Sequence, residues 1–315
     1  EPYHVWLSEI MLQQTRVEAV KGYYARFLSE LPTIEALAAC PPDRLTKLWE
    51  GLGYYSRVRN LQKAAKVIMD EHGGAFPETY EAVRALPGVG DYTAGAICSI
   101  CFDLPTPAVD GNVLRVLSRV MEDGAPVTNQ KTKTAYREAL LPLYEAGSRG
   151  TLTQALMELG AMVCVPNGAP KCESCPLQEL CLANAHGTWE KYPVKEAKKA
   201  KREEEKTVFY LTCDGCLAVR KRESRGLLAG LWELPNVEGK LDAAQALSFA
   251  EKAGCEPAEL LKSVERVHVF THIIWRMRCY YIVCKEKSPE FVWASDARRK
   301  TDVALPTAFR MFVEE

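Results

Sequence analysis

Apolar residues recur at three- and four-residue spacing from residue 5 to about residue 190, which is the pattern of amphipathic helices. Ile10, Val17 and Tyr24 are examples of this repeat. Prolines such as the Pro41-Pro42 pair separate the helical segments. Thr79 stands where an N-cap would begin another helix. We therefore expect one helix after another throughout this region.

The pattern changes after Pro193. Residues 195–206 (KEAKKAKREEEK) carry dense mixed charge and no apolar residue larger than alanine, which indicates an exposed linker or a solvated helix. Two β-rich runs then flank Asp214-Gly215, a strong hairpin signal. A helix near Asp242–Ala253 and further β-rich runs follow. The sequence thus predicts a mainly α region over residues 1–192, a linker over 193–206 and a small α+β domain over 207–315.

Composition places the chain among globular proteins. It has 315 residues, 47% hydrophobic and 26% charged. Polar residues interrupt every apolar stretch, so we expect no membrane-spanning helix and no membrane partner. A net charge of −1 argues against a protein that coats nucleic acid nonspecifically, although backbone N–H groups can still build a phosphate site. Because the chain starts at Glu1 without methionine, we expect an upstream segment, with any targeting signal, to be missing.

Four of the 12 cysteines lie within one short stretch that is typical of a metal site. Thiolates this close can hold a zinc ion or a four-iron cluster, and their spacing does not separate the two. Such usage also favours a reducing, intracellular location. Two other pairs have simpler readings: Cys98 and Cys101 as core residues, and Cys213 and Cys216 as strand ends of a hairpin, with metal chelation or cross-linking as alternatives. The four clustered cysteines are Cys164, Cys172, Cys175 and Cys181.

Residues 86–97 (LPGVGDYTAGAI) join two helical segments through a glycine turn. Gly88 and Gly90 can adopt positive φ and let a phosphate approach the backbone, and the helix that starts at Asp91 or Tyr92 directs its free N–H groups at the same place. A plain turn between helices is equally consistent with this stretch alone.

Two carboxylates are candidates for acid–base chemistry. Glu9 lies among apolar helical residues, which should raise its pKa and suit it as a general acid. Asp110 stands at the expected start of a helix, where the dipole and free N–H groups should favour its ionised form. Environments that separate two pKa values in this way are typical of an acid paired with an anionic stabiliser. Taken alone, Glu9 could be a surface residue and Asp110 a simple N-cap.

Several of these stretches resemble the MutY family of adenine DNA glycosylases. The similarity is strong over residues 3–182, where SEIMLQQT, LPGVGDYTAGAI, VDGNV and the cysteine loop match family motifs, and weaker beyond the linker. It implies a helix-hairpin-helix glycosylase with two helical subdomains, a six-helix one (about 16–120) and a cluster subdomain (1–15 and 121–192), followed by a Nudix-like domain. It also implies one 4Fe-4S cluster on the four cysteines.

This sequence departs from the family at three places. Seven, two and five residues separate its clustered cysteines, where the family usually has six, two and five. Asp91 stands where proline or arginine is common, so we expect it to point away from DNA and cap its helix. The Nudix metal motif is degenerate in ALSFAEKAGCE, so we expect no pyrophosphatase activity.

The resemblance also implies residue roles. Glu9 would protonate an everted adenine, Asp110 would stabilise the positive charge on the sugar, and Tyr92 and Asn112 would orient them. Tyr92 replaces the lysine that forms a Schiff base in lyases of this superfamily, which predicts a monofunctional enzyme. Gln14, Leu52 and Tyr54 would intercalate, and Arg57 would meet phosphate. Leu12, Thr15, Val17 and Gln154 would line the adenine pocket. Phe270, Thr271 and His272 would read 8-oxoguanine.

The expected partner is double-stranded DNA with 8-oxoguanine:A or G:A mispairs, bound by a monomer. The location would be bacterial cytoplasm at the nucleoid, or the nucleus or mitochondrion of a eukaryote. Three alternatives stand beside this hypothesis: an endonuclease III-like glycosylase and lyase, a non-catalytic sensor of DNA structure, and a Nudix hydrolase. Tyr92 opposes the lyase. The pair of carboxylates, Glu9 and Asp110, opposes the non-catalytic sensor. The degenerate metal motif opposes the Nudix hydrolase.

Overall fold

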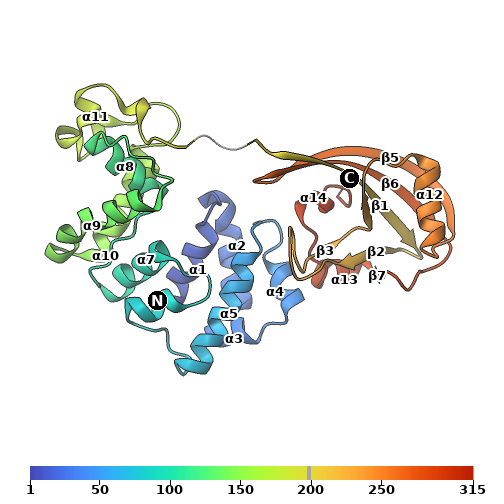
Figure 1. Cartoon of the computed structure of the whole chain (residues 1–315). Coiled ribbons are helices and arrows are strands. Elements are labelled where there is room, and N and C mark those ends of the chain that lie inside the picture. Colours follow the sequence, from blue (N-terminus) through green and yellow to red (C-terminus); the bar gives the residue numbers. More distant parts are fainter. Residues whose placement is uncertain (197–199, 315) are drawn as a thin grey trace. The chain divides into compact units, whose positions relative to one another are not determined.

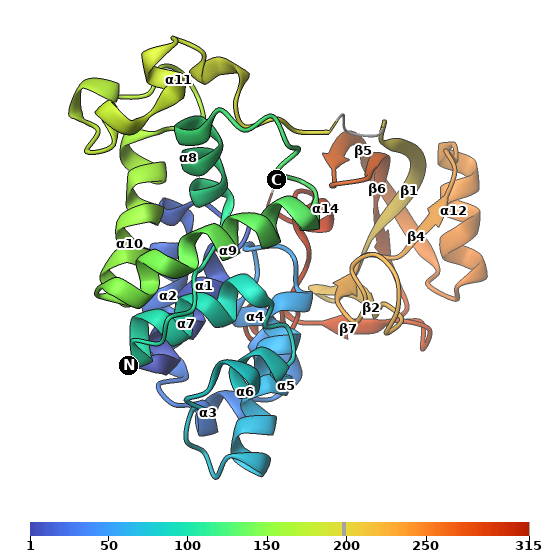
Figure 2. The ribbon, with the colours of Figure 1, turned by 60° about the vertical axis from the view of Figure 1, so that its left-hand side comes forward.

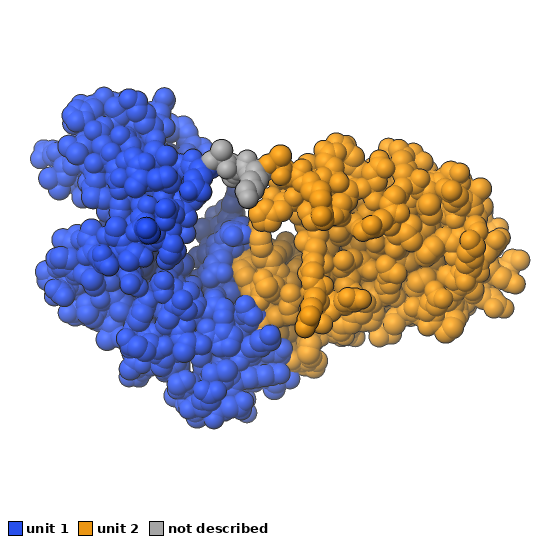
Figure 3. All heavy atoms as spheres, viewed as in Figure 1, with its two compact units in different colours: residues 1–39, 60–197 blue, residues 40–59, 198–315 orange. Residues whose placement is uncertain are grey.

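The computed structural model describes residues 1–196 and 200–314, which form two compact units (Figure 3). The first unit comprises residues 1–39 and 60–197, and the second comprises residues 40–59 and 198–315. The first is helical and the second mixes helices with a sheet, which confirms the predicted fold class. None of the helices in the described ranges is long and apolar enough to cross a membrane.

The first unit contains a series of short helices (Figures 1 and 2). Helix α7 (Asp91–Phe102) packs against α1, α6 and α10, and is almost entirely buried between residues 93 and 99. The predicted N-cap forms: Thr79 Oγ1 accepts a hydrogen bond from Ala82 N–H at the start of α6. The remaining elements are α1 (Pro2–Leu12), α2 (Val17–Glu30), α3 (Ile34–Ala39), most of α5 (Ser56–Glu71), α6 (Tyr80–Ala85), α8 (Gly111–Met121), α9 (Gln130–Ala146), α10 (Arg149–Glu158), the π-helix η1 (Leu159–Val163), the 3-10 turns η2 (Cys172–Ser174), η3 (Gln178–Leu180) and η4 (Trp189–Lys191), and α11 (Leu182–Ala185).

The second unit is built on a sheet of order β3-β2-β1-β6-β5, to which β4 and β7 add by pairing with β1 and β2. β1 and β6 run parallel and the other pairs are antiparallel. The predicted hairpin forms at Asp214-Gly215, between β1 and β2. The strands are β1 (Arg202–Cys213), β2 (Cys216–Lys221), β3 (Trp232–Glu233), β4 (Asn236–Glu238), β5 (Pro257–Val269), β6 (Ile273–Cys284) and β7 (Val292–Ala294), and the helices are α4 (Pro42–Leu48), α12 (Ala243–Lys252), α13 (Asp296–Thr301) and α14 (Thr307–Arg310).

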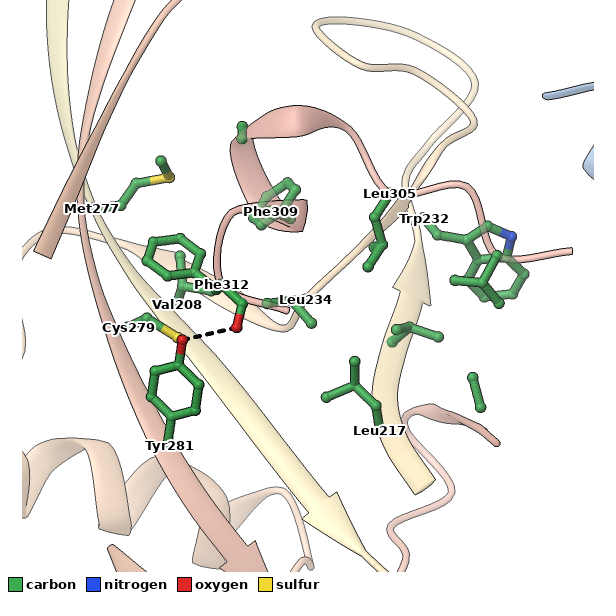
Figure 4. Close-up of a cluster of buried hydrophobic side chains, with 14 of the residues drawn as sticks. Val208, Leu217, Trp232, Leu234, Met277, Cys279, Tyr281, Leu305, Phe309 and Phe312 are labelled. Carbon is green, nitrogen blue, oxygen red and sulfur yellow. Dashed lines mark hydrogen bonds between the residues drawn. The ribbon is translucent and has the colours of Figure 1, made fainter. Parts of the chain in front are cut away.

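Alternation along the strands divides the core of this unit in two, because successive side chains point to opposite faces. Phe209, Leu211 and Cys213 of β1 pack with alanines of α12, whereas Val208 packs on the opposite face with Phe309 and Phe312 from the C-terminal segment (Figure 4). There the Tyr281 hydroxyl donates a hydrogen bond to Phe312 O over 2.8 Å. Helix α12 lies along the sheet (Figure 1) and has the capping box of Asp242 and Gln245.

Strand β1 begins at Arg202, inside the segment 193–206 that the sequence predicts as a linker. The charged residues there find partners on β6. Glu203 forms an ion pair with Arg276, and Glu204 accepts a hydrogen bond from the Trp275 indole. These pairs compensate for the missing apolar residues, so a charged run can continue a strand. Residues 197–199, within the same predicted linker, lie outside the described residues.

Candidate active site

Glu9 is buried on α1, between apolar residues that pack toward α7. The hydroxyl of Tyr92, in the first turn of α7, donates a hydrogen bond to Glu9 Oε2. Burial raises the pKa of Glu9, the charge of Asp110 raises it further, and the Tyr92 hydrogen bond opposes the rise. The protonated form is therefore favoured, as expected from the apolar neighbours of Glu9 in the sequence.

Asp110 is the N-cap of α8. Its Oδ1 accepts a hydrogen bond from Val113 N–H over 2.7 Å, and its Oδ2 accepts one from the Asn112 side-chain amide over 2.9 Å. The hydrogen bonds at the helix terminus lower its pKa as expected, but the expectation of a net lowering is wrong. Burial raises the pKa of Asp110, and the hydrogen bonds from Val113 and Asn112 oppose this rise without reversing it. The same donors hold the carboxyl group in one orientation.

Tyr92 brings the two carboxyl groups into one site. Its pKa is raised first by burial and then by the charges of Glu9 and Asp110, so both lie within electrostatic range of this hydroxyl. Glu9, Tyr92 and Asp110 come from α1, α7 and the start of α8, which the chain separates widely. A buried acid within electrostatic range of a hydrogen-bonded carboxyl group fits the pair of carboxyl groups used in hydrolysis of a glycosidic bond.

Arg115 lies behind this site and connects it to the cysteine loop. It is buried on α8, and its Nη2 donates hydrogen bonds to Asn112 Oδ1 over 2.8 Å and to Gly160 O over 2.7 Å. Its Nε donates to Cys164 O over 2.7 Å. We did not identify Arg115 from the sequence, although a charged residue on the apolar face of an amphipathic helix was an available signal.

Gly160 is required where it stands, in the π-helix that leads to Cys164. A Cβ atom there would lie 2.5 Å from Asn112 Cβ, closer than real Cβ contacts occur. Because Gly160 has no side chain, the π-helix can approach Asn112 closely. Arg115 can therefore donate hydrogen bonds both to Asn112 and to Gly160.

The four clustered cysteines line a single pocket between α8, η1 and α11. Burial, with the neighbouring thiols of Cys181, Cys164 and Cys175, raises the pKa of Cys172. Arg119 is buried beside them and its Nη1 donates to Cys164 Sγ over 3.2 Å. A cation that donates to sulfur stabilises a thiolate, which is the form that binds metal.

The glycine turn differs from expectation at two positions. Gly88 has φ of 80°, and a Cβ there would lie 2.6 Å from Asn60 Cβ, whereas Gly90 is extended with φ of −98°. Gly90, not Asp91, is the N-cap of α7. Asp91 instead pairs with Arg84, whose Nε lies 2.6 Å from Asp91 Oδ1 and whose Nη1 donates to Val89 O. The carboxylate is therefore neutralised beside the turn.

In the second unit, the predicted intercalating turn has one exposed aromatic residue. Tyr54 has positive φ and is exposed, whereas Leu52 is buried. Arg57 is also buried and donates to Leu52 O and Gly53 O over 3.0 and 3.1 Å, because the tight turn directs these carbonyls inward. Intercalation by Leu52 and phosphate contact by Arg57 stay predictions.

The predicted reader residues form the turn between β5 and β6. Thr271 and His272 are exposed, and the Phe270 ring packs edge-on against Trp275. Thr271 Oγ1 lies 3.0 Å from the Tyr54 hydroxyl, within hydrogen-bond distance. A side chain predicted to intercalate and one predicted to read the opposite base are thus in contact.

The adenine-pocket residues stay predictions. In the first unit Leu12 and Thr15 are partly buried at the end of α1 and in the turn that follows. Val17 and Gln154 are exposed. Gln14, which is predicted to intercalate and not to line the pocket, has positive φ and is also exposed. All five are accessible to a ligand to some degree.

Comparison with known proteins identifies the family. The model of HhH-GPD superfamily base excision DNA repair proteins matches residues 7–142, and that of the NUDIX domain matches residues 207–315. The adenine DNA glycosylase of Rattus norvegicus is 32% identical in an alignment covering 99% of this chain and 72% of that protein. The chain belongs to the adenine DNA glycosylase family. The Schizosaccharomyces pombe member of this family is also 32% identical, with 94% and 76% covered.

Solved structures agree with this assignment for the helical unit. A thermostable thymine-DNA glycosylase is 28% identical with a TM-score of 0.51, covering 59% of this chain and 85% of that one. An endonuclease III in a non-covalent DNA complex has a TM-score of 0.52 at 24% identity, covering 59% and 86%, and shows the fold alone. The family membership and glycosylase fold predicted from the sequence are confirmed.

Proposed function

We propose that this enzyme is a monofunctional DNA glycosylase of base-excision repair that removes adenine paired with 8-oxoguanine or guanine in double-stranded DNA. Membership of the adenine DNA glycosylase family supports hydrolysis of the N-glycosidic bond of adenine. One observation carries the mechanism: the Tyr92 hydroxyl donates a hydrogen bond to Glu9, and the charge of Asp110 acts on both groups.

In the proposed mechanism an everted adenine lies beside Glu9. The Tyr92 hydroxyl donates its hydrogen to Glu9 Oε2, so the other oxygen, Oε1, carries the acidic proton. This proton passes to N7 of the base. The bond between C1′ and the base then breaks, and its electron pair leaves with adenine. The Asp110 carboxylate, oriented by Asn112, stabilises the cationic sugar or traps it covalently, and water completes the hydrolysis.

Tyr92 also supports the monofunctional assignment, because a phenol does not form the imine through which a lysine would cleave the DNA strand. Borohydride reduction in the presence of DNA should therefore trap no covalent complex. A trapped complex would place this enzyme with the lyases.

We propose that Thr271 senses 8-oxoguanine, which carries an N7–H donor where guanine has an acceptor. The exposed Thr271 hydroxyl can accept this hydrogen, and its contact with Tyr54 fixes the position of its oxygen. The hydroxyl of Tyr54 then acts as donor to Thr271, which leaves a lone pair for the base.

The four clustered cysteines are proposed to hold one 4Fe-4S cluster. They share one pocket beside the Arg119 guanidinium, and four thiolates in one short loop suit a four-iron cluster. The cluster would tie the loop to α8 through Cys164. Visible absorption of anaerobically purified protein tests it; a colourless protein with stoichiometric zinc would contradict it.

The experiment that tests the proposed function measures excision from duplexes with adenine opposite 8-oxoguanine, guanine or thymine under single-turnover conditions. We expect release to be fastest opposite 8-oxoguanine, slower opposite guanine and slowest opposite thymine. Equal rates on all three duplexes would remove the proposed substrate preference.

A further inference from the structure

Four cysteines of the second unit, separate from the clustered cysteines, lie side by side across one end of its sheet. Cys213 ends β1 and pairs directly with Cys216 at the start of β2. Thr212 of β1 pairs with Val283 of the parallel strand β6, so the next residues, Cys213 and Cys284, are neighbours. On the other side of β6, Cys284 pairs with Pro257, and the hydrogen bond of 3.3 Å from Glu286 N–H to Cys255 O continues that ladder.

These thiols also share one face of the sheet. Cys213, Cys255 and Cys284 belong to the buried core beneath α12. Ala218, two residues after Cys216, belongs to the same core, so alternation directs Cys216 to this face as well. The row therefore runs Cys216, Cys213, Cys284, Cys255. Cys279 of β6 packs in the core on the opposite face and is not a member.

The spacing of Cys216, Cys213 and Cys284 on adjacent strands suits disulfides between neighbours, and the Cys255 thiol interacts directly with that of Cys284 although Pro257 is the residue paired with Cys284. Adjacent strands lie about 4.8 Å apart, and disulfides form across Cα separations of roughly 4.4–6.8 Å. Three of the sulfurs lie on three neighbouring strands, and the fourth, that of Cys255, lies two residues before β5. Pairwise oxidation is the chemistry that this row supports.

The ends of the row differ in exposure. Cys216 is partly exposed, beside the turn where Lys287 Nζ lies 3.4 Å from Asp214 Oδ2, whereas Cys213, Cys284 and Cys255 are 2%, 4% and 0% exposed. At the inner end, Ser288 N–H donates to the Cys255 sulfur, the Cys255 and Cys284 thiols interact with each other, and Cys284 Sγ also donates to Ile282 O over 3.9 Å. Two hydrogen-bonded thiols at the buried end are poised to be joined.

We propose that this row is a thiol relay: a small disulfide such as oxidised glutathione reacts at Cys216, and the oxidation moves inward to a disulfide between Cys255 and Cys284. Cys216 attacks one glutathione sulfur and releases one reduced glutathione. Cys213 attacks the Cys216 sulfur and releases the second. Cys284 then attacks Cys213, freeing Cys216, and Cys255 attacks Cys284, freeing Cys213. In each exchange the attacking thiol gives its proton to the departing sulfur, so two thiols are oxidised and one glutathione disulfide is reduced.

Among the disulfides formed in these exchanges, the final one between Cys255 and Cys284 is the most stable. Cys213 and Cys216 flank a two-residue turn, so their disulfide closes a very small loop and constrains the unfolded chain little. A bond between Cys255 and Cys284 closes the much longer loop that contains β5 and most of β6, which constrains the unfolded chain more. It would also lock the base of the hairpin whose tip carries Thr271.

The test incubates the full-length, cluster-loaded protein with oxidised glutathione, quenches with acid at intervals, alkylates free thiols and maps linked peptides by mass spectrometry. We expect a Cys255–Cys284 link in the native protein and in C279S, the matched buried control on the opposite face. In C216S the same link should form at least ten times more slowly. In C213A, glutathione should remain on Cys216 because the resolving thiol is absent.

Absence of the Cys255–Cys284 link in the native protein would overturn the proposal. So would its formation in C216S at the native rate, because the oxidant would then reach the buried pair directly. Cys216 lies at the rim of the sheet, so C216S should fold normally; circular dichroism and visible absorption of each variant before oxidation confirm that the comparison is between folded proteins.

Discussion

Arg115 donates a hydrogen bond to Asn112 over 2.8 Å, and the Asn112 amide in turn donates to Asp110 over 2.9 Å. The same guanidinium bonds Cys164 O. A single buried side chain thus fixes the orientation of the aspartate and the start of the cysteine loop together. The position of Asp110 depends on the fold of a segment about fifty residues further along the chain.

Replacing Arg115 should therefore impair excision more than stability of the helical unit. R115Q removes the charge-assisted bonds to Gly160 and Cys164, and hydrogen bonds of this kind are worth about 1.5–3 kcal/mol. We expect single-turnover excision to slow by about 10- to 100-fold. R149Q, which removes the exposed ion pair with Asp103, is the control and should change the rate little. Equal effects of the two substitutions would contradict a positioning role.

Adding one methyl group at Gly160 should displace Asn112. Because the new Cβ would lie 2.5 Å from Asn112 Cβ, G160A forces α8 and the π-helix apart, and overpacking of this kind costs about 1–3 kcal/mol. Excision and melting temperature should both fall. At Gly147 the nearest atom to a new Cβ is 3.9 Å away, so G147A should be nearly neutral. Thermal unfolding followed by circular dichroism, with parallel excision assays, makes the comparison.

The pH dependence of excision should report the Glu9–Tyr92 hydrogen bond. The reaction needs protonated Glu9, so the rate falls as pH rises through the pKa of Glu9. The Tyr92 bond lowers that pKa, and its removal in Y92F should move the alkaline limb of the profile to higher pH. Y80F, which removes a hydroxyl that contacts Asp91 and Arg137, should leave the limb in place. A shift to lower pH in Y92F would show that Glu9 is not the acid.

Discrimination between 8-oxoguanine and guanine should depend on the Thr271 hydroxyl. T271V removes the acceptor, and a neutral hydrogen bond contributes about 0.5–1.5 kcal/mol. The ratio of excision rates opposite the two bases should fall by roughly 2- to 10-fold. T271S keeps the hydroxyl and should keep the ratio. An unchanged ratio in T271V would move the recognition of 8-oxoguanine elsewhere.

Local sequence patterns sufficed for much of this molecule. Helical periodicity, the Asp214-Gly215 turn and the cap at Thr79 depend on neighbouring residues, and each formed as predicted. The motifs around Glu9 and Asp110 also indicated their pairing, which rests on the resemblance to the family.

The features that could not be predicted from the sequence are those that depend on tertiary packing. The pKa of Asp110 follows from burial by distant segments, which outweighs the helix terminus. Leu52 and Arg57 are buried by the way their turn folds, and Arg115 gains its partners from a loop far along the chain. The neutralising partner of Asp91, Arg84, lies on the preceding helix, where residue type alone gave no indication of a contact.

The measurement that tests the central claim most directly compares E9Q with the native enzyme on a duplex with adenine opposite 8-oxoguanine. Gln is nearly the same size as Glu and can still accept the Tyr92 hydrogen bond, but it carries no acidic proton. The account predicts that E9Q binds the duplex almost as tightly as the native enzyme and releases no adenine in a single-turnover assay, while E18Q, at an exposed position, does both normally. Adenine release by E9Q at a rate near that of the native enzyme would contradict it.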